Sequence, residues 1–453
     1  MRTLAVLLVM LNILPALSQK DSVSNTGKIP FGGMDLNWVN GQSRVKDPPL
    51  VLKDKKGESI LAGTVYMDAY FNYNLADPVD NTQTISSSIG RHKETIINLA
   101  SIGVESNYKN CIGRLLVQYG AMQHIVQESD ASVDRGRNTG TANLKYIREA
   151  SAGYHFNKWH GVNVEMGIFM SYIGLESYLL QDNWCYQRSM VCDFTPFYFQ
   201  GLRLQLFPSK KMKQELWVLN GWQTYNSFSK QPGLGSSTYW RPNQNLQLVM
   251  NYYLGQDTQN PDTNGYQSDR LRFHHDNSIV ARYYNHSESK GISQMGISIN
   301  SHYGFQKGMN VGDTITSKQH FMYGTSITNR TWFNKNKIAL SLRGDYISNG
   351  GNYLAFSPSP VAPNDYTNSF TLEPYKPIEI IQATITLDIM PNDYFTFRIE
   401  YGHREANIPY FAGHGGTTSP SGWRNGPTTL VPWKPSLQKT EDRITLAMNF
   451  RLN

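Results

Sequence analysis

The chain is poor in charge and in cysteine. Asp, Glu, Lys and Arg make up 17% of its 453 residues, and there are only 3 Cys. Ordinary soluble domains contain about 25% charged residues. The formal net charge of +7 is small for this length, and no run of lysine or arginine is present. We therefore expect no nucleic-acid partner, because such partners require clustered positive charge.

Long apolar runs are also missing. Beyond the N-terminus, no stretch approaches the ~18 to 20 apolar residues that a spanning helix needs, which excludes a helical membrane protein. The one apolar run, Leu4 to Leu17, follows Arg2 and ends in the small residues around Ser18. This arrangement is typical of a secretory signal peptide. We predict a signal peptide over residues 1–18, with cleavage after Ser18.

The chain is rich in aromatic residues and in a two-residue alternation of apolar and polar side chains. It has 27 Tyr and 9 Trp. In the stretch 162–171, one set of alternate residues is Val162, Val164, Met166, Ile168 and Met170, and the other is Asn163, Glu165, Gly167, Phe169 and Ser171. A period of two places the apolar set on one face of a β-strand. That face either forms the core of a soluble sandwich or contacts lipid in a membrane barrel.

The lengths of the connections decide between these two folds. About 15 amphipathic strands follow one another from Leu61 to the C-terminus, the last over 443–452. Short connections, at 107–110, 157–161, 208–213 and 391–393, alternate with long ones, at 76–93, 124–142, 172–195, 223–243, 349–377 and 404–435. Sorting short turns to one end and long loops to the other is typical of outer-membrane barrels. The alternation fails once, between Gly255 and Lys318, where one further strand would restore an even number.

We therefore predict an all-β fold, a transmembrane antiparallel β-barrel of about 16 strands, with 14 to 18 possible. The domain organisation that we expect is a signal peptide over 1–18, a periplasmic N-terminal lead-in over 19–60, and the outer-membrane barrel over 61–453. The lead-in is rich in Gly, Asp, Lys and Pro, a composition that does not favour a domain of its own.

Several stretches also resemble a known family. They are WVNGQSR (38–44), REASAGYHF (148–156), GVNVEMGIFMSYIGLESY (161–178), NWCYQRS (183–189), DFTPFYFQGLR (193–203), LNGWQTY (219–225), WRPN (240–243) and RFHHDNS (272–278). Together they resemble the OmpL-like β-barrel porins common in Bacteroidetes, over most of the mature chain. The resemblance implies an outer-membrane porin. It identifies no solute and carries no catalytic residue.

Charges on the polar face of otherwise clean strands should line the lumen. A charge on the lipid face would cost ~2 to 4 kcal/mol at mid-membrane. The predicted pore-lining residues are Glu165, Arg203, Arg343, Asp345, Arg398, Glu400 and Arg443.

The long connection 172–195 is the best candidate for a functional loop. Porin loops that fold into the lumen narrow it, with carboxylates facing arginines. The residues that could do this here are Glu176, Asp182, Arg188 and Asp193. The alternative is that the loop covers the extracellular mouth, and the residues leave both interpretations open. Cys185 and Cys192 in this loop could form a local disulfide or remain free thiols.

Metal and catalytic chemistry are not expected. His274, His275 and Asp276 look like a ligand cluster, but adjacent strand residues point to opposite faces, so both rings cannot easily reach one ion. We therefore predict no metal site, no cofactor and no enzymatic activity.

The sequence thus predicts a porin in the outer membrane of a Gram-negative bacterium, a water-filled channel for passive diffusion of small polar solutes or ions. The expected partners are outer-membrane lipid and small hydrophilic solutes, and a homo-oligomer is possible. The alternative is a secreted β-rich glycan-binding protein or glycosidase, which would need two carboxylates across a cleft.

Overall fold

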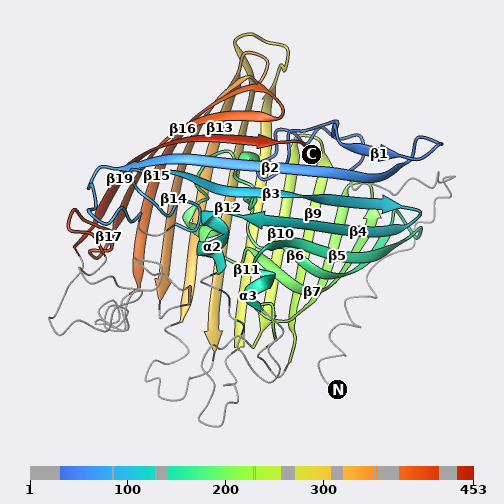
Figure 1. The fold of residues 1–453 in the computed structure, drawn as a ribbon, viewed down its shortest axis with the longest axis horizontal. Coiled ribbons are helices and arrows are strands. Elements are labelled where there is room, and N and C mark those ends of the chain that lie inside the picture. The colour runs from blue at the N-terminus through green and yellow to red at the C-terminus, as the bar shows by residue number, and fades with distance from the viewer. Residues whose placement is uncertain are drawn as a thin grey trace.

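A closed antiparallel β-barrel forms the body of the protein (Figure 1). The computed structural model describes residues 31–83, 86–127, 130, 132, 141–227, 229, 231–256, 271–307, 320–350, 353–354, 377–417 and 436–453. The predicted signal peptide and residues 19–30 of the predicted lead-in lie outside these ranges. In the described part of the chain, 16 strands close the barrel, which confirms the predicted fold class.

Neighbouring strands of the barrel follow one another along the chain. They are β2 (Ser59–Asn74), β3 (Thr95–Tyr108), β4 (Cys111–Tyr119), β5 (Ile147–Phe156), β6 (Val162–Met170), β7 (Tyr198–Ser209), β8 (Met212–Leu219), β9 (Gly233–Asn243), β10 (Leu246–Gly255), β11 (Leu271–Asn285), β12 (Ile292–Lys307), β13 (Phe321–Phe333), β14 (Ile338–Gly350), β15 (Ile378–Asn392), β16 (Phe395–Ala406) and β19 (Thr440–Arg451). The last strand pairs with the first, from Arg443 opposite Asn74 to Arg451 opposite Tyr66. This seam removes the free strand edges that an open sheet would leave.

The remaining elements are short. Strand β1 (Val51–Lys53) pairs with β2, and β17 (Phe411–Ala412) pairs with β18 (Leu437–Gln438) outside the barrel sheet. The helices are α2 (Ala121–Gln127), α3 (Thr141–Leu144), the 3₁₀ turn η2 (Leu180–Asp182) and α4 (Met190–Asp193). Among the described residues, no helix has the length and apolar character needed to cross a membrane.

The outer surface of the barrel is apolar and its interior is polar. On β10, Met250, Tyr252 and Leu254 are exposed, whereas Gln247 and Asn251 are buried. Outward aromatic residues gather near both ends of the strands: Phe156, Trp240, Tyr283 and Phe397 near the short turns, and Tyr119, Tyr252, Tyr303 and Tyr401 nearer the long loops. An apolar band between two aromatic belts is the surface that a lipid bilayer requires.

One strand lies where the sequence predicted a loop. The strand missing from the sequence count is β9, inside the predicted connection 223–243, and not a strand between Gly255 and Lys318. Its outward face carries Ser236 and Thr238 between Leu234 and Trp240, so the apolar alternation that reveals the other strands is weak here. Its pairing with β8 and β10 holds it in the sheet, although its own alternation of apolar and polar residues is weak.

Candidate functional site

A long loop between β6 and β7 occupies the interior of the barrel. We call residues 171–197 the lumen loop. Leu180, Tyr186 and Met190 of this loop are fully buried, and its polar atoms bond to strands β14 and β16. Strands β6 and β14 lie half the barrel's circumference apart in the strand order. The lumen loop therefore crosses the lumen, the first of the two interpretations that the sequence left open.

Arg398 on β16 holds the tip of the lumen loop. Its guanidinium donates to the carbonyl oxygens of Leu180, at 2.7 Å, and Asn183, at 2.5 Å. The same group forms a two-pronged ion pair with Asp388 on β15, with both N···O distances 2.8 Å. Arginine suits this position because its planar fork presents several donors at once.

Glu400 lies two residues along the same inward face of β16. Its carboxylate accepts hydrogen bonds from the backbone N–H groups of Tyr186, at 2.6 Å, and Gln187, at 3.2 Å. Arg443 on β19 lies 3.6 Å from it and 3.2 Å from Glu441. The wall thus offers an anion to the loop's N–H groups and a cation to its carbonyl groups.

Arg343 on β14 is the third anchor. It donates to the backbone oxygen of Gln187, at 2.6 Å, and its Nη1 atom lies 3.3 Å from Glu176 of the loop. Asp345, on the same strand face, holds the Nε–H of Arg343 at 2.9 Å. Because buried charges are stable only when they are paired and hydrogen-bonded, these contacts explain how the interior accommodates them.

Glu165 and Arg203 pair on the other side of the lumen. They are register partners on β6 and β7, with Arg203 Nη2 2.7 Å from Glu165 Oε2. The guanidinium also lies 4.4 Å from the centre of the Phe169 ring. Every residue predicted to line the pore therefore points inward: Glu165, Arg203, Arg343, Asp345, Arg398, Glu400 and Arg443. Their role in conduction stays a prediction.

The charged residues of the lumen loop are each engaged in a specific contact. Glu176 accepts from Ser189 N at 2.6 Å, and Asp182 pairs with Arg451 on β19 at 2.5 Å. Asp193 accepts from the hydroxyl groups of two serines in the loop after β2. Arg188 lies over the Phe197 ring at 4.4 Å. Its Nε and Nη1 atoms have no hydrogen-bond partner among the described residues.

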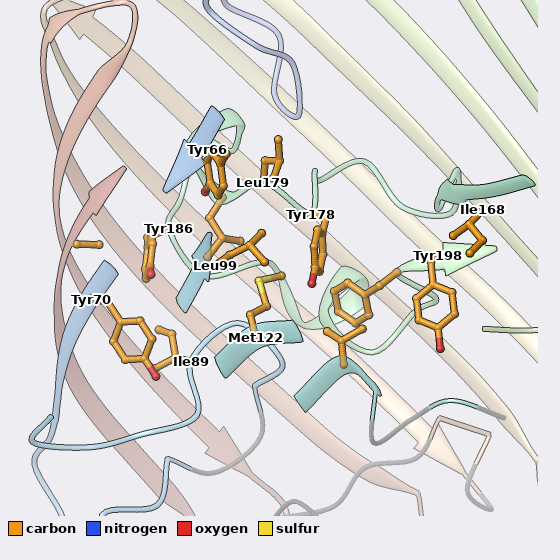
Figure 2. Close-up of a cluster of buried hydrophobic side chains, with 14 of the residues drawn as sticks. Tyr66, Tyr70, Ile89, Leu99, Met122, Ile168, Tyr178, Leu179, Tyr186 and Tyr198 are labelled. Carbon is orange, nitrogen blue, oxygen red and sulfur yellow. The ribbon is translucent and has the colours of Figure 1, made fainter. Parts of the chain in front are cut away.

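An aromatic cluster packs the lumen loop against β2 and β3 (Figure 2). Tyr186 lies near Tyr70, with ring centroids 6.3 Å apart. The Tyr186 hydroxyl donates to Asp68 at 3.0 Å. Tyr178 extends the cluster from Leu179 toward Tyr198, as Figure 2 shows. These contacts hold the loop against β2 and β3, which follow the anchor strands β16 and β19 around the barrel.

The N-terminal segment also reaches the lumen loop, a feature that sequence reasoning missed. The indole N–H of Trp184 donates to Trp38 O at 2.9 Å, and Trp184 N donates to Asn40 Oδ1 at 2.9 Å. Trp38 is 3% exposed. The sequence feature that could have predicted this contact is the apolar pair Trp38 and Val39, which lies within a mostly polar stretch. The periplasmic location of residues 19–60 stays a prediction.

The disulfide that the sequence left open is absent from this structure. Cys185 and Cys192 are both free and buried. The backbone oxygen of Cys185 faces Arg398 on β16, at 3.5 Å, whereas the Cys192 sulfur lies 3.2 Å from Asn300 Oδ1 on β12. The backbone of Cys185 and the thiol of Cys192 are therefore held against strands that lie several positions apart in the barrel.

The closed barrel, its apolar outer belt and its polar interior define a transmembrane β-barrel of the outer membrane. The chain belongs to the family described as "Putative beta-barrel porin-2, OmpL-like", whose sequence profile matches residues 61–431. It is thus an outer-membrane porin, as the sequence predicted, and the secreted glycan-binding or glycosidase alternative is set aside. No curated protein matches the sequence.

Solved outer-membrane proteins have similar barrels. The channel DcaP of Acinetobacter baumannii is 11% identical, with a TM-score of 0.48 and coverage of 89% of this chain and 99% of that one. In-vitro folded OmpT of Vibrio cholerae is 8% identical, with a TM-score of 0.48 and coverage of 88% and 99%. An anion-selective porin from Comamonas acidovorans is 6% identical, with a TM-score of 0.46 and coverage of 86% and 99%. The family assignment rests on the profile match.

Proposed function

We propose that the lumen loop is the constriction of this porin and sets the size limit for small polar solutes that diffuse through it. The observation that carries the proposal is the set of buried contacts, from Arg343, Arg398 and Glu400, that fasten the loop across the barrel. A loop held from several sides keeps a constant cross-section. A constant cross-section is what a passive size filter needs.

Passive diffusion requires neither a cofactor nor a catalytic step, and we propose that conduction through this protein uses neither. Charge selectivity should depend on Arg188, because the carboxylates of the lumen loop already have partners. We further propose that residues 1–18 direct export and that residues 19–60 lie on the periplasmic side. A homo-oligomer in the membrane plane stays a prediction.

The test is single-channel conductance of purified protein in a planar bilayer. We expect a variant in which a short Gly-Ser linker replaces residues 177–194 to conduct more than the wild type and to admit larger uncharged sugars, because the constriction is gone. A matched control is Trp159→Ala, which removes an exposed aromatic side chain from the short turn between β5 and β6. Its conductance should equal that of the wild type.

Charge is tested separately with a salt gradient. In Arg188→Gln, the reversal potential should shift toward cation preference while the conductance stays close to that of the wild type. If the loop-shortened variant kept the wild-type conductance and sugar exclusion, the loop would not be the constriction. An unchanged reversal potential in Arg188→Gln would exclude that residue as the selective charge.

A further inference from the structure

Three buried side chains of metal-ligating type meet on the inner wall of the barrel, apart from the anchors of the lumen loop. His274 and Asp276 are two residues apart on β11, so they share the inward face. His302 on β12 is the register partner of Asp276. The relative exposures are 0% for His274 and Asp276 and 3% for His302. Sequence reasoning paired His274 with His275, which points outward, and could not see the neighbour on the next strand.

The spacing of the three groups fits one small cation. One ligand atom from each residue lies within 4.8 Å of the other two. The imidazole nitrogens His274 Nε2 and His302 Nδ1 are 3.0 Å apart. Two ligands on a tetrahedral zinc ion, at bond lengths of about 2.0 to 2.1 Å, lie about 3.3 Å from each other. A small adjustment of either ring would bring both nitrogens to that spacing.

The outer nitrogens of both rings face oxygen atoms. His302 Nε2 lies 2.8 Å from Asn300 Oδ1, so this nitrogen carries the proton and leaves Nδ1 free to bind a cation. His274 Nδ1 lies 3.0 Å from the Tyr353 hydroxyl, which is also 3.0 Å from Phe273 O. With a metal on Nε2 of His274, its Nδ1–H donates to the Tyr353 oxygen and the hydroxyl donates to Phe273 O. Histidines that bind metals usually have such oxygen partners behind them.

Without a metal these contacts compete for protons. His274 must then donate its Nε2–H to His302, so its Nδ1 needs a proton from Tyr353. The single Tyr353 hydroxyl proton serves either His274 or Phe273 O, but not both. A cation between the two rings removes this conflict.

The charge of Asp276 points the same way. Its carboxylate accepts hydrogen bonds from Asn251 Nδ2, at 3.0 Å, and Gly174 N, at 3.1 Å. Among the described residues, it has no ion-pair partner, unlike the carboxylates that face Arg343 and Arg398. A buried carboxylate without a counter-ion is costly, and a bound divalent cation would supply the missing charge.

We propose that His274, Asp276 and His302 form a binding site for a divalent transition metal ion of the zinc class. Two imidazoles and one carboxylate are a donor set that suits zinc and leaves a fourth position for water. The site would also connect the wall to the lumen loop, because Gly174, whose φ of +88° favours glycine, donates its N–H to Asp276. The proposal is independent of the loop's role as a constriction.

The test is isothermal titration of ZnCl₂ into detergent-solubilised full-length protein that carries no polyhistidine tag and has been dialysed against a chelator. We expect one ion per chain and a higher midpoint of thermal unfolding with zinc. His302→Gln and Asp276→Asn should each weaken zinc affinity at least about tenfold, as removing even an outer partner of a ligand does. His275→Gln is the matched control, because it removes a neighbouring imidazole on the outer face and should bind like the wild type.

Folding of each variant is checked by the mobility of the unheated barrel on a denaturing gel. Asp276→Asn nearly preserves the shape of the side chain, so it remains informative if His302→Gln fails to fold. The proposal is overturned if the wild type binds no zinc. It is equally overturned if folded His302→Gln or Asp276→Asn binds zinc as tightly as His275→Gln does, since the ion would then lie elsewhere.

Discussion

The inward arginines combine two tasks that are usually separate. Arg398 neutralises Asp388 and, with the same guanidinium, donates to two carbonyl groups of the lumen loop. A lysine could form the ion pair, but its donors share a single nitrogen atom and could not also reach both carbonyl groups. The balance of charge in the lumen and the position of the loop therefore depend on the same side chains.

We expect Arg398→Gln to destabilise the barrel by about 3 to 5 kcal/mol, because removing Arg398 takes a counter-charge away from the buried carboxylate of Asp388. Arg330, 2.7 Å from Asp388, would retain part of the pairing, so the lower end of that range is expected. Channel recordings should also become noisier as the loop tip loses two hydrogen bonds. Denaturant unfolding of the refolded barrel measures the first effect. In Lys335→Gln, which removes an exposed ion pair with Glu288, the change should stay below about 1 kcal/mol.

The loop between β2 and β3 shows how an element outside the membrane is held in place. Asp77, near the start of this loop, accepts hydrogen bonds from His92 and Lys93, near its end. The backbone oxygen of Asp77 lies 2.8 Å from His414 Nδ1, in the connection after β16. The carboxylate of Asp77 therefore closes its own loop, and the backbone oxygen of the same residue joins that loop to the connection after β16.

The contacts of the Asp77 carboxylate with Lys93 and His92 should weaken in acid. Hydrogen bonds from Lys93 and His92 lower the pKa of Asp77 below its ordinary value. A carboxylate with a lowered pKa stabilises the bound arrangement above its ordinary pKa, and this contribution is lost as the pH falls through the lowered pKa. We expect conductance fluctuations of the wild type to increase once the pH drops below the ordinary Asp value of about 3.9. In Asp77→Asn, the conductance should fluctuate more than in the wild type at neutral pH. Lowering the pH through this acidic range should add no further fluctuation from residue 77. Equal recordings for both proteins at every pH would contradict this role of Asp77.

The wall of the barrel as a whole is apolar on its outer face and polar on its inner face. Leu248 lies on the outward face of β10, across from Ile279 of β11 and Trp240 of β9. Since this face contacts lipid, we expect Leu248→Arg to reduce assembly. Its cost should be below the ~2 to 4 kcal/mol of a mid-membrane site, because Leu248 lies at the height of the aromatic belt beside Trp240. The measurement is the yield of folded barrel in the outer-membrane fraction. Leu248→Ile preserves the apolar surface and should assemble normally, and normal assembly of Leu248→Arg would contradict the assigned facing.

The strands were largely predictable, because a half-buried strand leaves its period of two in the order of residues. The closing strand β19 alternates from Arg443 onward, and the sequence predicted it there. Strand β9 was not, since serine and threonine on its outer face hide the period. A strand of this kind is held by its neighbours on both sides, and that information lies in other parts of the chain.

The sequence by itself determined the class of the protein and the inward facing of its charges. Both follow from local periodicity and from the cost of placing charge in lipid. Only the tertiary structure decided that the lumen loop turns into the barrel and that Arg343 and Arg398 meet it there. It alone brought His302 beside His274 and Asp276. The physical reason is distance along the chain: closing a barrel places residues from remote strands in contact, and no local pattern records which of them will meet.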